Sequence, residues 1–140
     1  MAGWRVGMLL GAKPILEEVL KVKTQMDSGM FYGIQQGAIA ALKVSSSWFS
    51  EMNDVYEKRR KLVWEIADAL ECSYDKNTSG MFVWAKTPEG VKAESMVDHL
   101  LYNKDIFIAP GSIFGSSGEG YIRFSLCVSE EKIKEALERL

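Results

Sequence analysis

The chain has 140 residues, of which 47% are hydrophobic and 26% are charged, and its formal net charge at pH 7 is −2. This composition is typical of a globular domain, and the length suffices for one hydrophobic core. The charge argues against nucleic acid as a partner, and no apolar stretch is long enough to cross a membrane. The one basic run, Lys58–Lys61, lies on a predicted helix between Glu57 and Glu65, so we expect it to be solvated.

Hydrophobic periodicity predicts the elements of the chain. Apolar residues spaced by three and four indicate helices, and short apolar runs bounded by glycine or turn residues indicate strands. In chain order, the predicted elements are a strand at 4–11, a helix at 14–26, helical structure from Tyr32, a long helix at 48–70 with Ser47 as its N-cap, strands at 72–74 and 81–86, a helix at 91–101, strands at 106–109 and 121–127, and a last helix after Ser129. This order predicts an α/β fold, a small two-layer domain whose short mixed or antiparallel sheet is covered by helices, one of them long.

The cysteines and the histidine give no sign of a disulfide or metal site. Cys72 and Cys127 each lie in an apolar stretch, where a buried thiol is the default, and a reducing, cytoplasmic compartment fits them best. His99, the only histidine, has no second histidine or cysteine near it in the sequence, so we expect no metal.

Two arginines carry the strongest functional signal. Arg5 lies in the segment Ala2–Gly7, and Arg123 lies in Tyr121–Leu126, directly after the glycine-rich loop Pro110–Gly120. A guanidinium among apolar and small residues is costly to bury without an anionic partner. Its planar set of donors suits a carboxylate or a phosphate. The pair therefore predicts a ligand that carries one of each.

Both arginines also have a structural interpretation. Arg123 would then form an ion pair with a nearby carboxylate such as Glu119, and Arg5 would be an arginine at the edge of the fold. The loop 110–120 lacks the Gly-Lys-Ser/Thr ending of a phosphate-binding loop, and we expect it to be a mobile loop over a ligand pocket.

These segments also resemble a known family. Ala2–Gly7 is similar to the segment just after the cofactor-binding lysine of class I/II aminotransferases, the fold-type I pyridoxal-phosphate enzymes. The Pro-Gly, Phe-Gly and Tyr-x-Arg-x-Ser elements within 110–125 resemble the end of that family. Ser28-Gly29, followed by Gln35 and the alanine-rich stretch 38–42, resembles its middle. The matches occur in the family's order and together cover essentially the whole chain.

The resemblance implies the C-terminal part of an aspartate aminotransferase-like enzyme. Residues 1–30 would be a remnant of the large cofactor-binding domain and its connection, and residues 31–140 the small C-terminal domain. The complete enzyme would be a homodimer that uses pyridoxal 5'-phosphate, with an amino acid and a 2-oxo acid as substrates. The family's Schiff-base lysine would fall before Met1, so we expect no catalytic residue in this chain and no activity from it alone.

The family's binding residues can be matched to three positions. Arg123 matches the arginine that grips the substrate's α-carboxylate, and Arg5 matches the one that holds the cofactor's phosphate. Phe82 matches a residue that lines the substrate pocket, although its place in an apolar strand predicts a core position.

Other functions fit the same residues. A β-eliminating lyase of the same fold uses both arginines, and some transcription regulators carry an aminotransferase-like domain that senses a ligand. A standalone binding or assembly domain without catalytic function is the third alternative.

Overall fold

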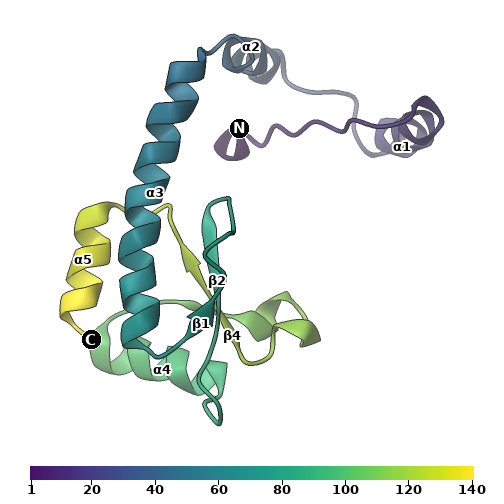
Figure 1. Ribbon diagram of the computed structural model, residues 1–140. Helices are drawn as coiled ribbons and strands as arrows, with labels where there is room; N and C mark the ends of the chain where they lie inside the picture. Colours follow the sequence, from purple (N-terminus) through teal and green to yellow (C-terminus); the bar gives the residue numbers. More distant parts are fainter. The chain divides into compact units, whose positions relative to one another are not determined.

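The computed structural model describes residues 1–140, apart from the side chain of Ala2. The chain divides into two compact units, residues 1–48 and residues 49–140 (Figure 1). The boundary lies inside the first turns of the long helix α3, Ser46–Ala69. The domain boundary after residue 30 that the family resemblance implies stays a prediction.

The first unit is helical. It contains the short 3-10 helix Ala2–Trp4, α1 at Lys13–Met26 and α2 at Tyr32–Ala41. The strand predicted at 4–11 is wrong: Arg5 has a positive φ of 55°, and residues 6–12 form no regular element. An apolar run needs a neighbouring strand to satisfy its backbone groups, and residues 1–48 as described contain no strand.

The first unit has no buried side chain among those that the structure describes. No side chain of α1 or α2 is buried, and Ile15, Val19 and Leu20, which form the apolar stripe of α1, are exposed. Trp4 packs against α2, where a Cβ on Gly37 would lie 2.9 Å from the indole ring. The stripe of α1 therefore has the pattern of a packed helix without a surface to pack on.

The second unit is built on an antiparallel sheet. Its strands are β1 (Ser73–Tyr74), β2 (Phe82–Lys86), β3 (Ala109–Pro110) and β4 (Tyr121–Ser125), in the order β1-β2-β4-β3. Of the two predicted forms, a mixed sheet and an antiparallel sheet, the structure has the antiparallel one. The strand predicted at 106–109 is short, because only Ala109 and Pro110 pair with β4.

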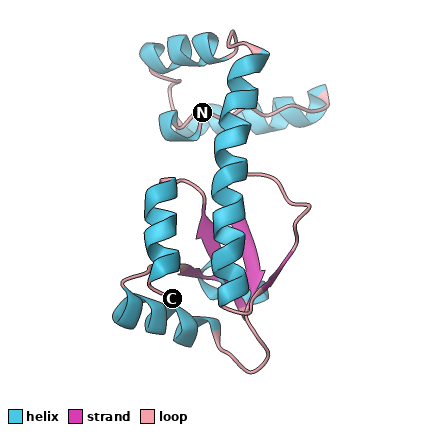
Figure 2. Cartoon of the chain, turned by 60° about the vertical axis from the view of Figure 1, so that its left-hand side comes forward, coloured by secondary structure: helices cyan, strands magenta, loops and turns pink.

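Helices α3, α4 (Ala93–Lys104) and α5 (Glu130–Glu138) cover one face of this sheet (Figure 2). Each contributes apolar side chains to a single core, together with the strand residues that point towards the helices. The buried members include Val63 and Ile66 of α3, Val97 and Leu100 of α4, Ile133 of α5, and Val83, Ala85, Ile122 and Phe124 of the strands. The predicted fold class, a two-layer α/β domain with one long helix, is confirmed.

Helix boundaries differ from the predictions in two places. Ser47 lies inside α3, which begins at Ser46, so it does not act as the predicted N-cap. The helix predicted from residue 91 begins at Ala93 as α4. Ser129 does occupy the N-cap position of α5, as predicted, with Glu130 and Glu131 in the first turn, where carboxylates complement the helix dipole.

The basic run on α3 is only partly solvated. Lys58 and Lys61 are exposed, and Lys61 forms an ion pair with Glu57 at 2.7 Å. The predicted solvation is wrong for Arg60, which is 9% exposed, and for Arg59, which is half-buried. Consecutive helical residues point in different directions, and these two side chains donate to backbone carbonyls at one end of the sheet.

The two thiols differ in environment. Cys72 is buried, and its burial raises the pKa of the thiol to about 11, whereas Cys127 is exposed, so the predicted burial of Cys127 is wrong. We expect iodoacetamide at neutral pH to modify the exposed Cys127 of the folded chain quickly. The buried Cys72 is expected to react only after unfolding, since the thiolate is the reactive form and burial raises the pKa of this thiol. Mass spectrometry of tryptic peptides checks this, with Cys127→Ser as the control that leaves no fast-reacting thiol. Rapid modification of Cys72 would contradict it.

Candidate anion-binding site on the open face of the sheet

The face of the sheet that points away from the helices carries a cluster of aromatic side chains and one arginine. Phe82 and Trp84 of β2 alternate with core residues, and Trp84 lies opposite Arg123 of β4 in the strand register. Phe82 is 40% exposed, so its predicted core position is wrong. Because side chains of a strand alternate between faces, burial of Val83 and Ala85 places Phe82 on the open face.

The Arg123 guanidinium lies between two aromatic rings. Its central carbon is 4.2 Å from the ring centroid of Phe82 and 4.0 Å from that of Phe114. Both distances are within the range of cation–π interactions. The ion pair with Glu119, the structural alternative, is not formed: among the described residues no carboxylate lies within 4.0 Å of this guanidinium, and none accepts a hydrogen bond from it. Its donors are therefore free for an anion.

Phe114 is a site residue that the sequence did not identify. It ends a 3-10 turn, Gly111–Phe114, which is followed by a second, Ser116–Gly118. The two turns pack directly against each other: a Cβ on Gly118 would lie 2.0 Å from the Gly111 carbonyl oxygen. The glycine-rich loop is thus a pair of closely packed turns that places Phe114 over Arg123. The Phe-Gly pair in the loop was the only sequence signal for it.

Trp84 continues the aromatic surface beside Arg123. Its ring stacks on Tyr121 with the centroids 5.4 Å apart, and it meets Phe114 edge-on at 6.0 Å. It also contacts the loop, because a Cβ on Gly111 would lie 2.9 Å from the indole. A cation with free donors next to an apolar wall suits a small amphipathic anion, for which the arginine binds the charged end.

A hydrogen bond ties the loop to α4. The Ser112 hydroxyl donates to the Glu94 carboxylate, and this bond is the main reason that the pKa of Glu94 lies below its ordinary value. A lowered pKa means that the bond contributes above the pKa of the unfolded state and is lost as the pH falls through the folded-state pKa. We expect Ser112→Ala to raise the pKa of Glu94 towards its ordinary value, as measured by NMR titration of its side-chain carboxyl carbon. An unchanged titration curve would contradict this role of Ser112.

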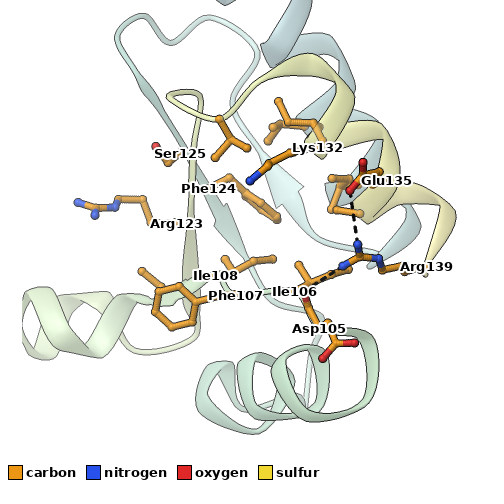
Figure 3. Close-up of a pocket in the computed structure, with 16 residues that line it drawn as sticks. Asp105, Ile106, Phe107, Ile108, Arg123, Phe124, Ser125, Lys132, Glu135 and Arg139 are labelled. Atoms are coloured by element: carbon orange, nitrogen blue, oxygen red, sulfur yellow. Dashed lines mark hydrogen bonds and ion pairs between the residues drawn. The ribbon is translucent and has the colours of Figure 1, made fainter.

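The second unit also contains a cavity of about 450 Å³ (Figure 3). It is lined by α5, the segment 105–109 and β4, and Arg139 crosses part of it, donating to the Asp105 carbonyl at 3.2 Å and pairing with Glu135 at 3.5 Å. Arg123 contributes to the lining, but its guanidinium points away from Lys132, Glu135 and Arg139. The Arg123 guanidinium is therefore directed to the arginine–aromatic site and not towards the charged residues of this cavity.

Arg5 belongs to the first unit and Arg123 to the second. Arg5 is exposed, and its side chain has no ion pair or hydrogen bond among the described residues. A free guanidinium fits the phosphate of pyridoxal 5'-phosphate, so the residue present is compatible with the cofactor that the family resemblance implies. Within the residues described, no group of three His, Cys, Asp or Glu side chains could hold a metal ion, and no helix has the length and apolar character needed to span a membrane.

The whole chain matches a known family. The model of aminotransferase class I and II covers residues 1–140, and the chain therefore belongs to the class I and II aminotransferase family. Among its relatives, it is 41% identical over 140 residues to the LL-diaminopimelate aminotransferase of Halothermothrix orenii, and 36% identical to that of Aquifex aeolicus. Both alignments use 100% of this chain and 36% of the relative. The chain thus spans about a third of the length of these relatives.

Solved structures agree with this assignment. The aromatic aminotransferase from Pyrococcus horikoshii is 32% identical, with a TM-score of 0.85 over 99% of this chain and 38% of that structure. The aspartate aminotransferase from Thermotoga maritima is 26% identical, with a TM-score of 0.81 over 99% of this chain and 35% of that structure.

Proposed function

We propose that this chain is the C-terminal part of a pyridoxal-phosphate-dependent aminotransferase that transfers an amino group between an L-amino acid and a 2-oxo acid. The observation that supports this proposal is the position of the Arg123 guanidinium. It lies between two aromatic rings on the open face of the sheet, and no described carboxylate pairs with it. In this proposal Arg123 binds the α-carboxylate that amino acids and 2-oxo acids share, through two parallel charged hydrogen bonds.

The aromatic rings orient this contact. Phe82 and Phe114 restrict the guanidinium from both sides, so a bound carboxylate is held in the plane of its donors. A fixed carboxylate fixes the Cα of the substrate, and such orientation contributes to the rate as well as to the affinity. Trp84 and Tyr121 give the neighbouring wall that excludes water from one side of the ligand.

The cofactor would be held in part by Arg5. Its exposed guanidinium would bind the phosphate of pyridoxal 5'-phosphate, which supplies the electron sink for the reaction when bound. By the family resemblance, no lysine of residues 1–140 matches the Schiff-base lysine. We therefore expect the 140-residue chain by itself to transfer no amino groups, and Arg5 alone to bind the cofactor weakly.

The particular substrate is proposed from the relatives. The similar sequences reported above are LL-diaminopimelate aminotransferases, whereas the solved structures include aromatic and aspartate aminotransferases. LL-diaminopimelate is the amino donor that we propose first, because these relatives are 36% and 41% identical across this whole chain.

Amino-transfer assays test the proposed function. The natural polypeptide that contains this sequence, loaded with pyridoxal 5'-phosphate, is assayed with 2-oxoglutarate and LL-diaminopimelate, aspartate or phenylalanine as the donor. We expect transfer from LL-diaminopimelate to be fastest. Absence of transfer from every donor would contradict the function, and faster transfer from another donor would contradict only the substrate.

The 140-residue chain is assayed beside it. We expect its rate to equal that of free pyridoxal 5'-phosphate under the same conditions. A rate above this cofactor-only control would contradict the proposal that the chain contains no catalytic lysine.

A further inference from the structure

Two adjacent arginines of α3 hold the ends of the two central strands. Arg59 donates from Nη1 to the Leu126 carbonyl oxygen at 2.9 Å, and Arg60 donates from Nη2 to the Gly80 carbonyl oxygen. Gly80 lies just before β2 and Leu126 just after β4. Because β2 and β4 are antiparallel, both carbonyls lie at the same end of the sheet.

Burial of these guanidinium groups lowers the free energy of unfolding. Arg60 is 9% exposed, and among the described residues no carboxylate lies within ion-pairing distance of it. Arg60 Nη1 and Arg59 Nε are also buried and find no hydrogen-bond partner within the described part of the chain. The half-buried Arg59 guanidinium also lies 5.9 Å from the centroid of the Tyr56 ring. For Arg60, a buried charge compensated by a carbonyl group is a poor way to stabilise a fold, and an apolar side chain of similar volume is often as good or better. Stability alone therefore does not account for the buried Arg60.

The end of the sheet that they hold determines the geometry of the carboxylate site. Phe82 is opposite Ser125, and the Leu126 N–H donates to the Met81 carbonyl oxygen at 2.9 Å. In this register the ring of Phe82 reaches diagonally to Arg123, with 4.2 Å between the guanidinium carbon and the ring centroid. A shift of either strand end would move Phe82 relative to Arg123, and a slip by one residue would turn one of them to the other face.

We propose that Arg59 and Arg60 are positioning residues for the carboxylate-binding arginine. By fixing the Gly80 and Leu126 carbonyls on α3, they hold the strand register in which Phe82 lies against Arg123. The effect on ligand binding rests on the proposed function of Arg123, whereas the effect on the Phe82–Arg123 contact does not depend on it.

The test compares variants of the 140-residue chain well below the melting temperature of each. Arg60→Met and Arg59→Met remove one carbonyl contact each, Arg60→Lys keeps the charge, and Lys58→Met is the control on the exposed side of α3. Two quantities are measured by NMR: the ring-current shifts of the Arg123 δ-protons and the Kd for 2-oxoglutarate. We expect both Met variants to lose most of the ring-current shift and to bind roughly tenfold more weakly, because a small misplacement of a binding group is costly.

Compared with Arg60→Met, Arg60→Lys is expected to recover part of the ring-current shift and part of the affinity for 2-oxoglutarate. Lys58→Met is expected to change neither quantity. Normal Arg123 shifts and a normal Kd in folded Arg59 and Arg60 variants, with only a lower melting temperature, would overturn the proposal. If Arg60→Met does not fold, the Arg123 shifts and the Kd are measured in Arg60→Lys and in Arg59→Met, whose arginine is only half-buried. The same two outcomes then decide the proposal. If the unmodified chain fails to bind 2-oxoglutarate, the carboxylate role of Arg123 within this chain is contradicted, and the Arg123 shifts still decide whether the two arginines position it.

Discussion

Replacement of Arg123 with lysine is expected to lower the affinity of the chain for a 2-oxo acid by roughly tenfold to a hundredfold. Lysine keeps the positive charge but loses the planar pair of donors, so one charged hydrogen bond worth about 1.5–3 kcal/mol is lost. Lysine also cannot lie flat between the rings of Phe82 and Phe114 as the guanidinium does. The Kd for 2-oxoglutarate, measured by calorimetry or NMR titration, gives the result.

The matched control for this change is Arg139→Lys. Arg139 is another arginine of the second unit, but its guanidinium pairs with Glu135 and the Arg123 guanidinium points away from it. We expect Arg139→Lys to leave the Kd for 2-oxoglutarate unchanged. Equal affinity of Arg123→Lys and the unmodified chain would contradict the carboxylate role of Arg123, and an equal loss in both variants would contradict a role specific to Arg123.

Gly118→Ala is expected to destabilise the second unit by roughly 3 kcal/mol, at the upper end of the usual cost of overpacking. The added Cβ would lie 2.0 Å from the Gly111 carbonyl oxygen and 2.5 Å from its carbonyl carbon. Backbone atoms cannot rotate away as a flexible side chain does, so one of the two turns must move. For a unit of this size, such a loss corresponds to a fall in melting temperature of roughly 15 °C.

Gly120→Ala is the control for the Gly118 variant. Gly120 has a φ of +74°, and a Cβ there would meet no atom within 4 Å. The cost is then that of the left-handed conformation alone, about 1 kcal/mol. Circular dichroism melts of both variants measure the difference. A melting temperature for Gly118→Ala at or above that of Gly120→Ala would contradict the close contact between the two turns.

The local pattern of the sequence was enough to predict most of the second unit. The long helix at 48–70, the strand at 121–127 and the start of the last helix at Ser129 were predicted from short segments, and the structure has α3, β4 and α5 at these places. The order of these elements then gave the two-layer fold class. The family could also be identified, because Arg5 and Arg123 occur in recognisable segments in the right order.

Contacts between distant segments were beyond the reach of these patterns. The run 4–11 has the composition of a strand, but strand formation depends on a partner. In β2 both faces carry hydrophobic residues, so only the packing of the helices decided that Val83 is buried and Phe82 is open to solvent. Likewise, the basic run on α3 gave no sign that Arg60 is buried, since its partner at Gly80 lies on another element.

The sequence by itself thus determined the type of the elements, the fold class and the candidate carboxylate-binding arginine. The tertiary structure alone decided which aromatic rings enclose that arginine: Phe82 comes from β2 and Phe114 from the packed turns before β4. The physical reason is that periodicity reflects how each residue relates to its own helix or strand. The environment of Arg123 depends instead on side chains that only the packing of the folded chain brings together.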